Sequence, residues 1–223
     1  MPGELRIGRV KGEPIKPGEL SDGDGEFLVR LARKSVEYYL DKGRLMGLPE
    51  DVPPKLLRPG AAFVTIERVG ESGSRELRGC IGAIRPVEPL AVTVIKTSVE
   101  SAIGDPRFPP MDKRELDTVV FEVTVLGPLE PLPRDPRHRL RSFEIGVHGL
   151  YVEKPPYAGI LLPQVAVEEG WDQTLFLTWT CIKAGLPGTC WLRSDVKVYK
   201  FEAAIWAERE PRGPVYRRVL KGA

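Results

Sequence analysis

Two alternating segments joined by a glycine- and serine-rich turn restrict the fold of this chain more than any other feature. Residues 62–69 alternate in polarity and are rich in β-branched side chains. Residues 70–74 can turn the chain back into a second extended segment, which carries Cys80. The pattern therefore predicts a β-hairpin with a cysteine on its second strand.

The second strand of this hairpin contains the hexapeptide LRGCIG at residues 77–82. In a regular strand, alternation sends the side chains of Arg78 and Cys80 to the same face. A nearby cation favours the thiolate form of cysteine, and Gly79 and Gly82 would let a ligand approach the backbone. The hexapeptide thus predicts a site in which Arg78 holds an anionic or carbonyl group and Cys80 attacks or anchors it. Two simpler interpretations stay open: the glycines can allow tight packing or a bend, and the cysteine can be a small buried apolar residue.

Periodicity along the rest of the chain predicts helices mixed with strands. Helices are expected at 24–43, 89–104 and 174–184. Asp22 or Asp24 would cap the first helix, and a strand is the alternative for the second because it has many β-branched residues. Strands are expected at 119–126, 147–153, 159–162 and 196–205, with a proline-rich loop at 127–136. Strict βαβ alternation is absent, so the order favours an α+β fold.

The two ends of the chain differ from its middle in composition. Residues 1–23 are rich in Gly and Pro and predict an N-terminal extension with one short strand at 5–10. Residues 24–207 are expected to form the domain, and residues 208–223 a basic tail. This tail could touch phosphate, although a solvated tail is the simpler interpretation.

Composition excludes several classes of protein. A net charge of +2 is too small for a general nucleic-acid binder, and no apolar run is long enough to span a bilayer. The first twenty residues do not resemble a signal peptide, so a cytoplasmic location is expected. The chain has no Asn and contains 22 Pro, which is typical of a thermophile's protein.

Metal and cofactor motifs are absent from the sequence. The three Cys and two His show no C-x-x-C or H-x-x-x-H spacing, and no phosphate-binding loop or dinucleotide fingerprint is present, so neither metal nor cofactor is expected. Free thiols are the usual state of intracellular cysteines. A disulfide involving Cys181 or Cys190 stays open, because hyperthermophiles form such bonds in the cytosol.

Four polar residues outside the hairpin are further candidates. His148 could approach Cys80 across neighbouring strands and act as general base, or it could be satisfied by a backbone carbonyl at a strand end. Asp105 and Arg107 could contact a ligand or could cap and turn the chain. Gln164 could bind the polar edge of a ligand such as a base, or satisfy a loop.

Several motifs together carry a resemblance to a known family. They are LRGCIG at 77–82, DPRF at 105–108, GVHGL at 146–150, LLPQVA at 161–166, EGW at 169–171 and CIKAGL at 181–186. In this order they resemble the AMMECR family, over about residues 27–202. The resemblance implies a single compact α+β domain, with an antiparallel or mixed sheet flanked by helices and with a cleft; an arrangement in two lobes around that cleft stays open.

The family resemblance leaves the activity undetermined, because members have no settled biochemical function. Similar bacterial proteins are encoded beside a radical-SAM enzyme and a Memo-type protein, which are therefore the expected partners. We expect an enzyme or accessory factor that handles a small molecule or nucleotide in a radical-SAM-linked modification pathway. The alternative is a non-catalytic adaptor that binds protein or, with less support, nucleic acid through the same cleft.

Overall fold

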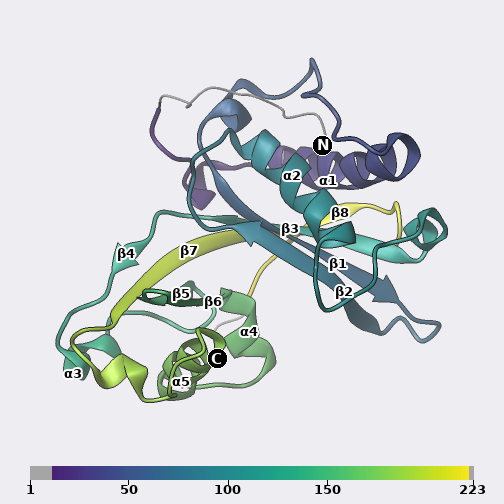
Figure 1. The fold of residues 1–223 in the computed structure, drawn as a ribbon. Coiled ribbons are helices and arrows are strands. Elements are labelled where there is room, and N and C mark those ends of the chain that lie inside the picture. The colour runs from purple at the N-terminus through teal and green to yellow at the C-terminus, as the bar shows by residue number, and fades with distance from the viewer. Residues whose placement is uncertain (1–11, 221–223) are drawn as a thin grey trace. The chain divides into compact units, whose positions relative to one another are not determined.

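The computed structural model describes residues 12–220 and contains helices and antiparallel strands, so the predicted α+β class is confirmed (Figure 1). The strand predicted at residues 5–10 lies outside the described part of the chain. The helices are α1 (Asp22–Lys42), α2 (Leu90–Ile103), α3 (Pro136–Arg139), α4 (Pro163–Glu168) and α5 (Gln173–Lys183). The strands are β1 (Ala61–Val69), β2 (Arg75–Ala83), β3 (Val119–Leu126), β4 (Glu130–Pro131), β5 (His148–Lys154), β6 (Tyr157–Leu161), β7 (Lys197–Glu208) and β8 (Val215–Arg218).

The pattern of contacts between residues divides the chain into two compact units. Of the described residues, unit 1 holds 12–126 together with Ala204–Arg218, and unit 2 holds Gly127–Ala203 and residues 219–220. Strand β7 therefore begins in unit 2 and ends in unit 1.

Unit 1 is built on the predicted hairpin, because β1 pairs antiparallel with β2 on one side and with β3 on the other. Helices α1 and α2 pack against each other and against this sheet. Leu28 and Val36 of α1, Ile95 of α2, and Val64 and Phe121 of the sheet share one apolar core.

The two long helices of unit 1 form for different reasons, local capping for α1 and burial for α2. Helix α1 is capped by Ser21 rather than by the predicted Asp22 or Asp24, and Asp24 completes a capping box by accepting the N–H of Ser21 at 2.8 Å. It ends at Gly43, whose backbone is left-handed. Helix α2 is helical despite its β-branched residues, since it is buried against α1 and the sheet and tertiary packing overrides weak propensity.

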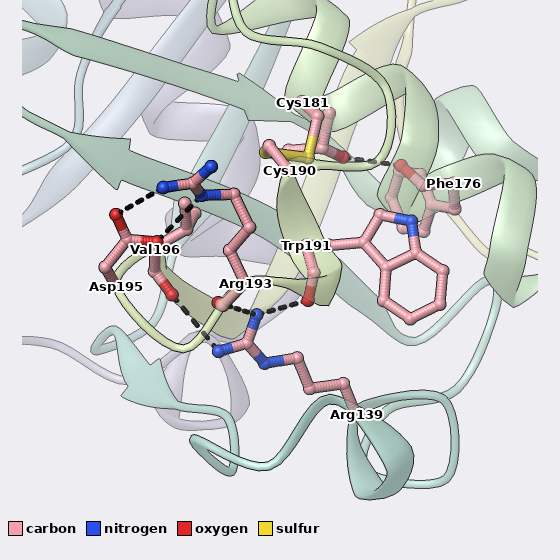
Figure 2. The surroundings of a disulfide bond; sticks show 9 residues. Arg139, Phe176, Cys181, Cys190, Trp191, Arg193, Asp195 and Val196 are labelled. Carbon is pink, nitrogen blue, oxygen red and sulfur yellow. Dashed lines mark hydrogen bonds and ion pairs between the residues drawn. A yellow bond between two sulfur atoms is a disulfide. The ribbon is translucent and has the colours of Figure 1, made fainter.

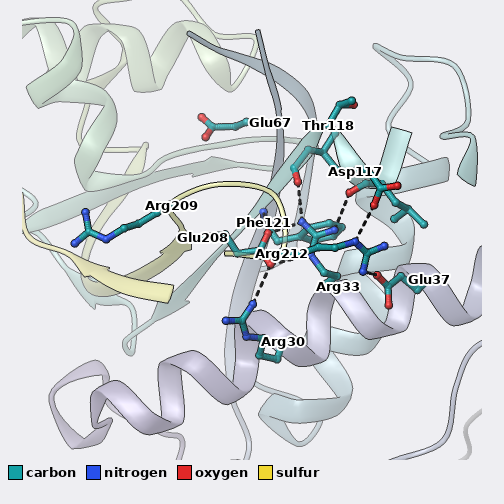
Figure 3. A network of polar contacts seen from close by, with 12 residues as sticks. Arg30, Arg33, Glu37, Glu67, Asp117, Thr118, Phe121, Glu208, Arg209 and Arg212 are labelled. Atoms are coloured by element: carbon teal, nitrogen blue, oxygen red, sulfur yellow. Dashed lines mark hydrogen bonds and ion pairs between the residues drawn. The ribbon is translucent and has the colours of Figure 1, made fainter. Parts of the chain in front are cut away.

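A buried ion pair ties the end of β7 to α1 in unit 1 (Figure 3). Nε and Nη2 of Arg33 donate to the carboxylate of Glu208 at 2.7 and 2.5 Å, and that carboxylate also accepts the N–H of Phe121 at 3.1 Å. Arg33 further donates to the carbonyls of Leu116 and Val119. Each nitrogen of the Arg33 guanidinium and each oxygen of the Glu208 carboxylate thus has a hydrogen-bond partner, which offsets the cost of burying the two charges.

The basic tail is partly structured, which corrects the prediction of a solvated segment. Strand β8 pairs antiparallel with the end of β7, and Arg218 donates to Glu122 at 2.9 Å. The guanidinium of Arg217 lies 5.3 Å from the ring centre of Trp206. Arg217 and Arg218 are therefore engaged in contacts within unit 1.

Unit 2 contains the two strands predicted at 147–153 and 159–162, which pair antiparallel as β5 and β6, and β5 also pairs with the first part of β7. Helix α5 packs on β5 and β6, and its buried residues Phe176 and Leu177 join an apolar core with Leu150 and Val198. Helix α4 lies in a segment for which no helix was predicted. No helix within residues 12–220 is both long enough and apolar enough to cross a membrane.

A disulfide joins Cys181 of α5 to Cys190, so the expectation of free thiols is wrong for these two residues (Figure 2). Beside it, the buried Arg139 donates to the carbonyl oxygens of Trp191 and, at 3.1 Å, of Val196. The covalent bond and the guanidinium together fasten the segment that follows α5 to the rest of unit 2.

Candidate functional site

Strand β2 is irregular at the LRGCIG hexapeptide. Ile66 of β1 pairs with Gly79 and the next residue, Glu67, pairs with Leu77, so Arg78 is an extra residue in a β-bulge. A bulge re-aims the side chain of its extra residue. The regular alternation that predicted a common face for Arg78 and Cys80 is therefore broken between them.

The side chain of Arg78 is engaged inside unit 1. Nε and Nη2 donate to the carboxylate of Glu115 at 2.8 and 3.0 Å, and Nη2 also donates to the carbonyl of Pro109 at 2.9 Å. Only 5% of the residue is exposed, and Nη1 is buried with no hydrogen-bond partner among the described residues. Hydrogen bonding to Arg78 is the main cause that lowers the pKa of Glu115 to about 2. Arg78 thus anchors β2 to the segment after α2.

This anchor lies at a surface pocket of about 380 Å³. Its walls are formed by Arg68, Glu76, Leu77, Arg78, Phe108, Pro109, Pro110 and Glu115. Arg68 also pairs with Glu115, at 2.6 Å. An anion that entered this pocket would have to compete with Glu115 for both arginines.

Cys80 is partly buried and is contacted from three directions. Its N–H donates to Oδ2 of Asp105 at 2.8 Å, its Sγ accepts from Oγ1 of Thr65 at 3.3 Å, and its carbonyl accepts from Nη2 of Arg107 at 3.3 Å. Burial raises the pKa of the Cys80 thiol, and the smaller opposing effects come from Thr65 and the charge of Arg107. This direction favours the neutral thiol, whereas the sequence predicted a thiolate stabilised by a neighbouring cation.

The cation beside Cys80 is Arg107, held by Asp105 at the end of α2. Oδ1 of Asp105 accepts the N–H and Nε of Arg107 at 3.1 and 2.9 Å, and Oδ2 accepts Nη2 at 2.7 Å. Asp105 is 3% exposed, whereas the side chain of Arg107 is 46% exposed. The guanidinium holds the pKa of Asp105 well below its usual value. Asp105 both turns the chain, as the simpler interpretation held, and fixes an exposed cation.

A polar row crosses the sheet of unit 1 at the level of Cys80. Thr65 of β1 stands opposite Cys80 on one side and opposite Glu122 of β3 on the other, and Glu122 pairs with Arg218. The strand register that aligns Glu122 with Cys80 appears only in the structure.

The two glycines of the hexapeptide are explained by packing. A Cβ atom on Gly79 would overlap the backbone carbonyl of Ser101 in α2, and one on Gly82 would overlap the ring of Phe63. The hydroxyl of Ser101 also accepts the N–H of Ile81 at 2.9 Å. Close contact between α2 and β2, the simpler interpretation, therefore accounts for Gly79.

His148 and Gln164 belong to unit 2. His148 begins β5, and its Nδ1 accepts the backbone N–H of Glu144 at 3.1 Å, so a neutral ring carries its proton on Nε2. Burial lowers the pKa of His148. Gln164 is buried near the start of α4. Proton transfer between His148 and Cys80 remains a prediction.

Metal binding has no candidate cluster in the described part of the chain, where no three His, Cys, Asp or Glu side chains are grouped to hold an ion. The groups around Cys80 are its own thiol, the hydroxyl of Thr65, the carboxylate of Asp105 and the guanidinium of Arg107.

Comparison with known proteins shows which family the chain belongs to. A protein of Aeropyrum pernix is 60% identical over 220 residues, which cover 99% of this chain and 94% of that protein. Protein PH0010 of Pyrococcus horikoshii is 49% identical over 202 residues, 91% of this chain and 98% of its own length. Its crystal structure, described as that of an uncharacterized protein, matches with a TM-score of 0.87 over 91% of this chain and 100% of the other. The AMMECR1 family model matches residues 29–206, and the chain therefore belongs to the AMMECR1 family.

Proposed function

We propose that this protein binds a small anionic molecule, bearing a phosphate or carboxylate group, at the site formed by Cys80, Asp105 and Arg107. One observation carries the proposal. Arg107 is held along one edge of its guanidinium by a buried carboxylate, yet nearly half of its side chain, 46%, is exposed next to a cysteine.

The geometry around Arg107 suits anion recognition. Asp105 fixes Nε and Nη2, so less side-chain freedom is lost when a ligand binds. Asp105 also accepts the N–H groups of Cys80 and Arg107, which spreads its negative charge over several donors. Phosphate and carboxylate are the groups that a guanidinium recognises best, because its planar N–H donors match their oxygen pairs.

The role of Cys80 in this proposal is that of a neutral thiol lining the site. A nucleophilic cysteine needs a lowered pKa or an adjacent base, and burial raises the pKa of Cys80. Ligand binding is therefore better supported than thiolate catalysis. Binding of this kind suits an accessory factor to the radical-SAM or Memo-type proteins that the family resemblance implies.

The chain contains a matched control for this proposal. Arg114 is held by Asp112 through the same side-on pair, at 2.9 Å from Nε and 3.2 Å from Nη2, but its side chain is 90% exposed. We expect calorimetric titration with inorganic phosphate and with adenosine monophosphate to detect binding to the protein and to Arg114→Gln. Arg107→Gln should bind at least about tenfold more weakly. Failure of both probes to bind, or equal binding by Arg107→Gln, would contradict the proposal.

A second candidate function is that of a non-catalytic adaptor that binds a macromolecular partner through the same site. The raised pKa of Cys80 favours it, because an adaptor needs no reactive thiol. Cys80→Ser should then leave binding of the macromolecular partner intact while Arg107→Gln weakens it. Loss of binding in the serine variant alone would argue against the adaptor.

A further inference from the structure

Helix α5 presents a ridge of large apolar side chains to solvent. Leu175, Trp179 and Ile182 are each 44% exposed, and their spacing of four and three residues places them on one face of the helix. The other face, which includes Phe176, Leu177 and Cys181, is buried in unit 2. The core of unit 2 therefore does not account for the apolar character of the exposed face.

The ridge is extended and stiffened by a second tryptophan. The rings of Trp171 and Trp179 are stacked, with centres 5.5 Å apart and planes 6° apart. A ring held in place before binding loses little freedom when it is covered, and tryptophan is enriched among the residues that dominate interface energies. Contiguous exposed apolar surface of this kind marks an interaction site.

Charge around the ridge restricts what can cover it. Glu169 and Asp172 are exposed at the end where α5 begins, and Lys183 is exposed at the end where it finishes. The acidic end would repel nucleic-acid phosphates and anionic lipid headgroups at the place where Trp171 would meet them. A protein surface with an apolar centre and one basic end fits this pattern.

A second copy of this chain supplies that surface, and we propose that α5 pairs antiparallel with α5 of another copy around a twofold axis near Trp179. Leu175 lies four residues before Trp179 and Ile182 three residues after it, so the axis sets Leu175 of one copy against Ile182 of the other. The same operation brings Lys183 of each copy near the acidic start of the opposite helix. Antiparallel helix dipoles also attract each other.

Two leucines of matched exposure test the position of the interface. Leu175 is 44% exposed on the ridge, and Leu57 is 39% exposed in unit 1. Sedimentation velocity of the full chain over a wide concentration range should show a monomer–dimer equilibrium, which Leu175→Glu abolishes and Leu57→Glu preserves. Glutamate is favourable in the first turn of a helix, so Leu175→Glu should fold. A protein that is monomeric at every concentration, or a dimer insensitive to Leu175→Glu, would overturn the proposal.

Charge variants test the antiparallel arrangement. Lys183→Glu should weaken the dimer at least about tenfold, because it sets two acidic groups together at both ends of the interface, whereas Lys34→Glu in unit 1 should not. Asp172→Asn removes the charge but keeps a good N-cap residue. Added salt should therefore weaken the dimer of this variant less than it weakens the dimer of the original protein. Dimers that respond equally to Lys183→Glu and Lys34→Glu would contradict antiparallel pairing.

Discussion

The carboxylate of Asp105 accepts the backbone N–H of Cys80 at 2.8 Å while it holds the guanidinium of Arg107. One buried group therefore sets both the position of the thiol's backbone and the position of the nearby cation. The arginine within the hexapeptide, Arg78, serves a different purpose, since it pairs with Glu115.

Asp105→Asn should destabilise the protein, because the amide cannot replace the charge that holds Arg107. We expect the free energy of unfolding to fall by about 1–3 kcal/mol, as for other buried polar groups that lose a partner. Urea denaturation measures this loss. The control is Asp112→Asn, which affects the exposed pair with Arg114 and should change stability by less than about 0.5 kcal/mol. If the two substitutions lowered the free energy of unfolding equally, Asp105 would have no special structural role.

The ion pair between Arg78 and Glu115 should make stability depend on acid pH. The pKa of Glu115 is lowered from 4.5 to about 2 in the folded protein. As the pH falls, Glu115 is therefore protonated at a higher pH in the unfolded state than in the folded state. The contribution of the pair is therefore complete above about pH 5 and is lost as the pH falls toward 2.

Comparison of the protein with Glu115→Gln tests this pH dependence. The difference between their free energies of unfolding should be largest near neutral pH and should shrink between about pH 5 and 2. A difference that stays constant over this range would show that the charge of Glu115 does not stabilise the fold.

Gly79→Ala should disrupt the contact between β2 and α2. The added methyl group would overlap the carbonyl oxygen of Ser101, and backbone atoms cannot move aside as a flexible side chain can. We expect a loss of about 1–3 kcal/mol or more, which is the usual range for overpacking. Gly47→Ala is the matched control, because nothing lies within 4 Å of its added Cβ. If Gly79→Ala left the free energy of unfolding unchanged, packing would not explain this glycine, and a functional reason would be needed.

The disulfide between Cys181 and Cys190 should stabilise unit 2 measurably. It links residues nine positions apart, for which chain entropy gives roughly 2–3 kcal/mol. Thermal unfolding of the protein should shift to lower temperature in a reducing agent, and the double variant Cys181→Ala/Cys190→Ala should no longer respond to it. Cys80→Ser is the control, which should still respond. An unchanged transition, with both thiols shown to be reduced by mass spectrometry, would contradict this role.

Alternation and turn residues were enough to predict β1, β2 and β3, because each strand has a clear period or a strong turn signal beside it. Helix α1 was predicted through its apolar spacing and Gly43, although Ser21 was missed as its cap. Short elements were missed for a physical reason. Helix α4 has only six residues, and β8 depends on pairing with β7 rather than on its own sequence.

The sequence named the residues of the candidate site, but it could not reveal the contacts of Arg78 and Arg107. Alternation alone cannot reveal the bulge at Arg78, since a bulge depends on the register of the neighbouring strand. Glu115 is 37 residues away from Arg78 in the chain, so their pairing follows only from the fold. Arg107 was a candidate through its motif, and the structure adds the contact of its Nη2 with Cys80.

Alkylation of Cys80 as a function of pH tests the state of its thiol. Because burial raises the pKa of Cys80, the rate of reaction with iodoacetamide should rise with a midpoint above the ordinary value of 9.0. Cys181 and Cys190 do not compete while they are joined. A midpoint below that value would indicate a stabilised thiolate and would revive the nucleophilic role.

The positive electrostatic potential around Cys80 is measured most directly by comparing the rates at which anionic iodoacetate and neutral iodoacetamide alkylate its thiol. If Arg107 provides the anion-binding charge, the ratio of the iodoacetate rate to the iodoacetamide rate should fall several-fold, on the order of threefold or more, in Arg107→Gln. Arg114→Gln, which alters the exposed pair with Asp112, should leave the ratio unchanged. A ratio that is the same in the protein and in Arg107→Gln would contradict the account.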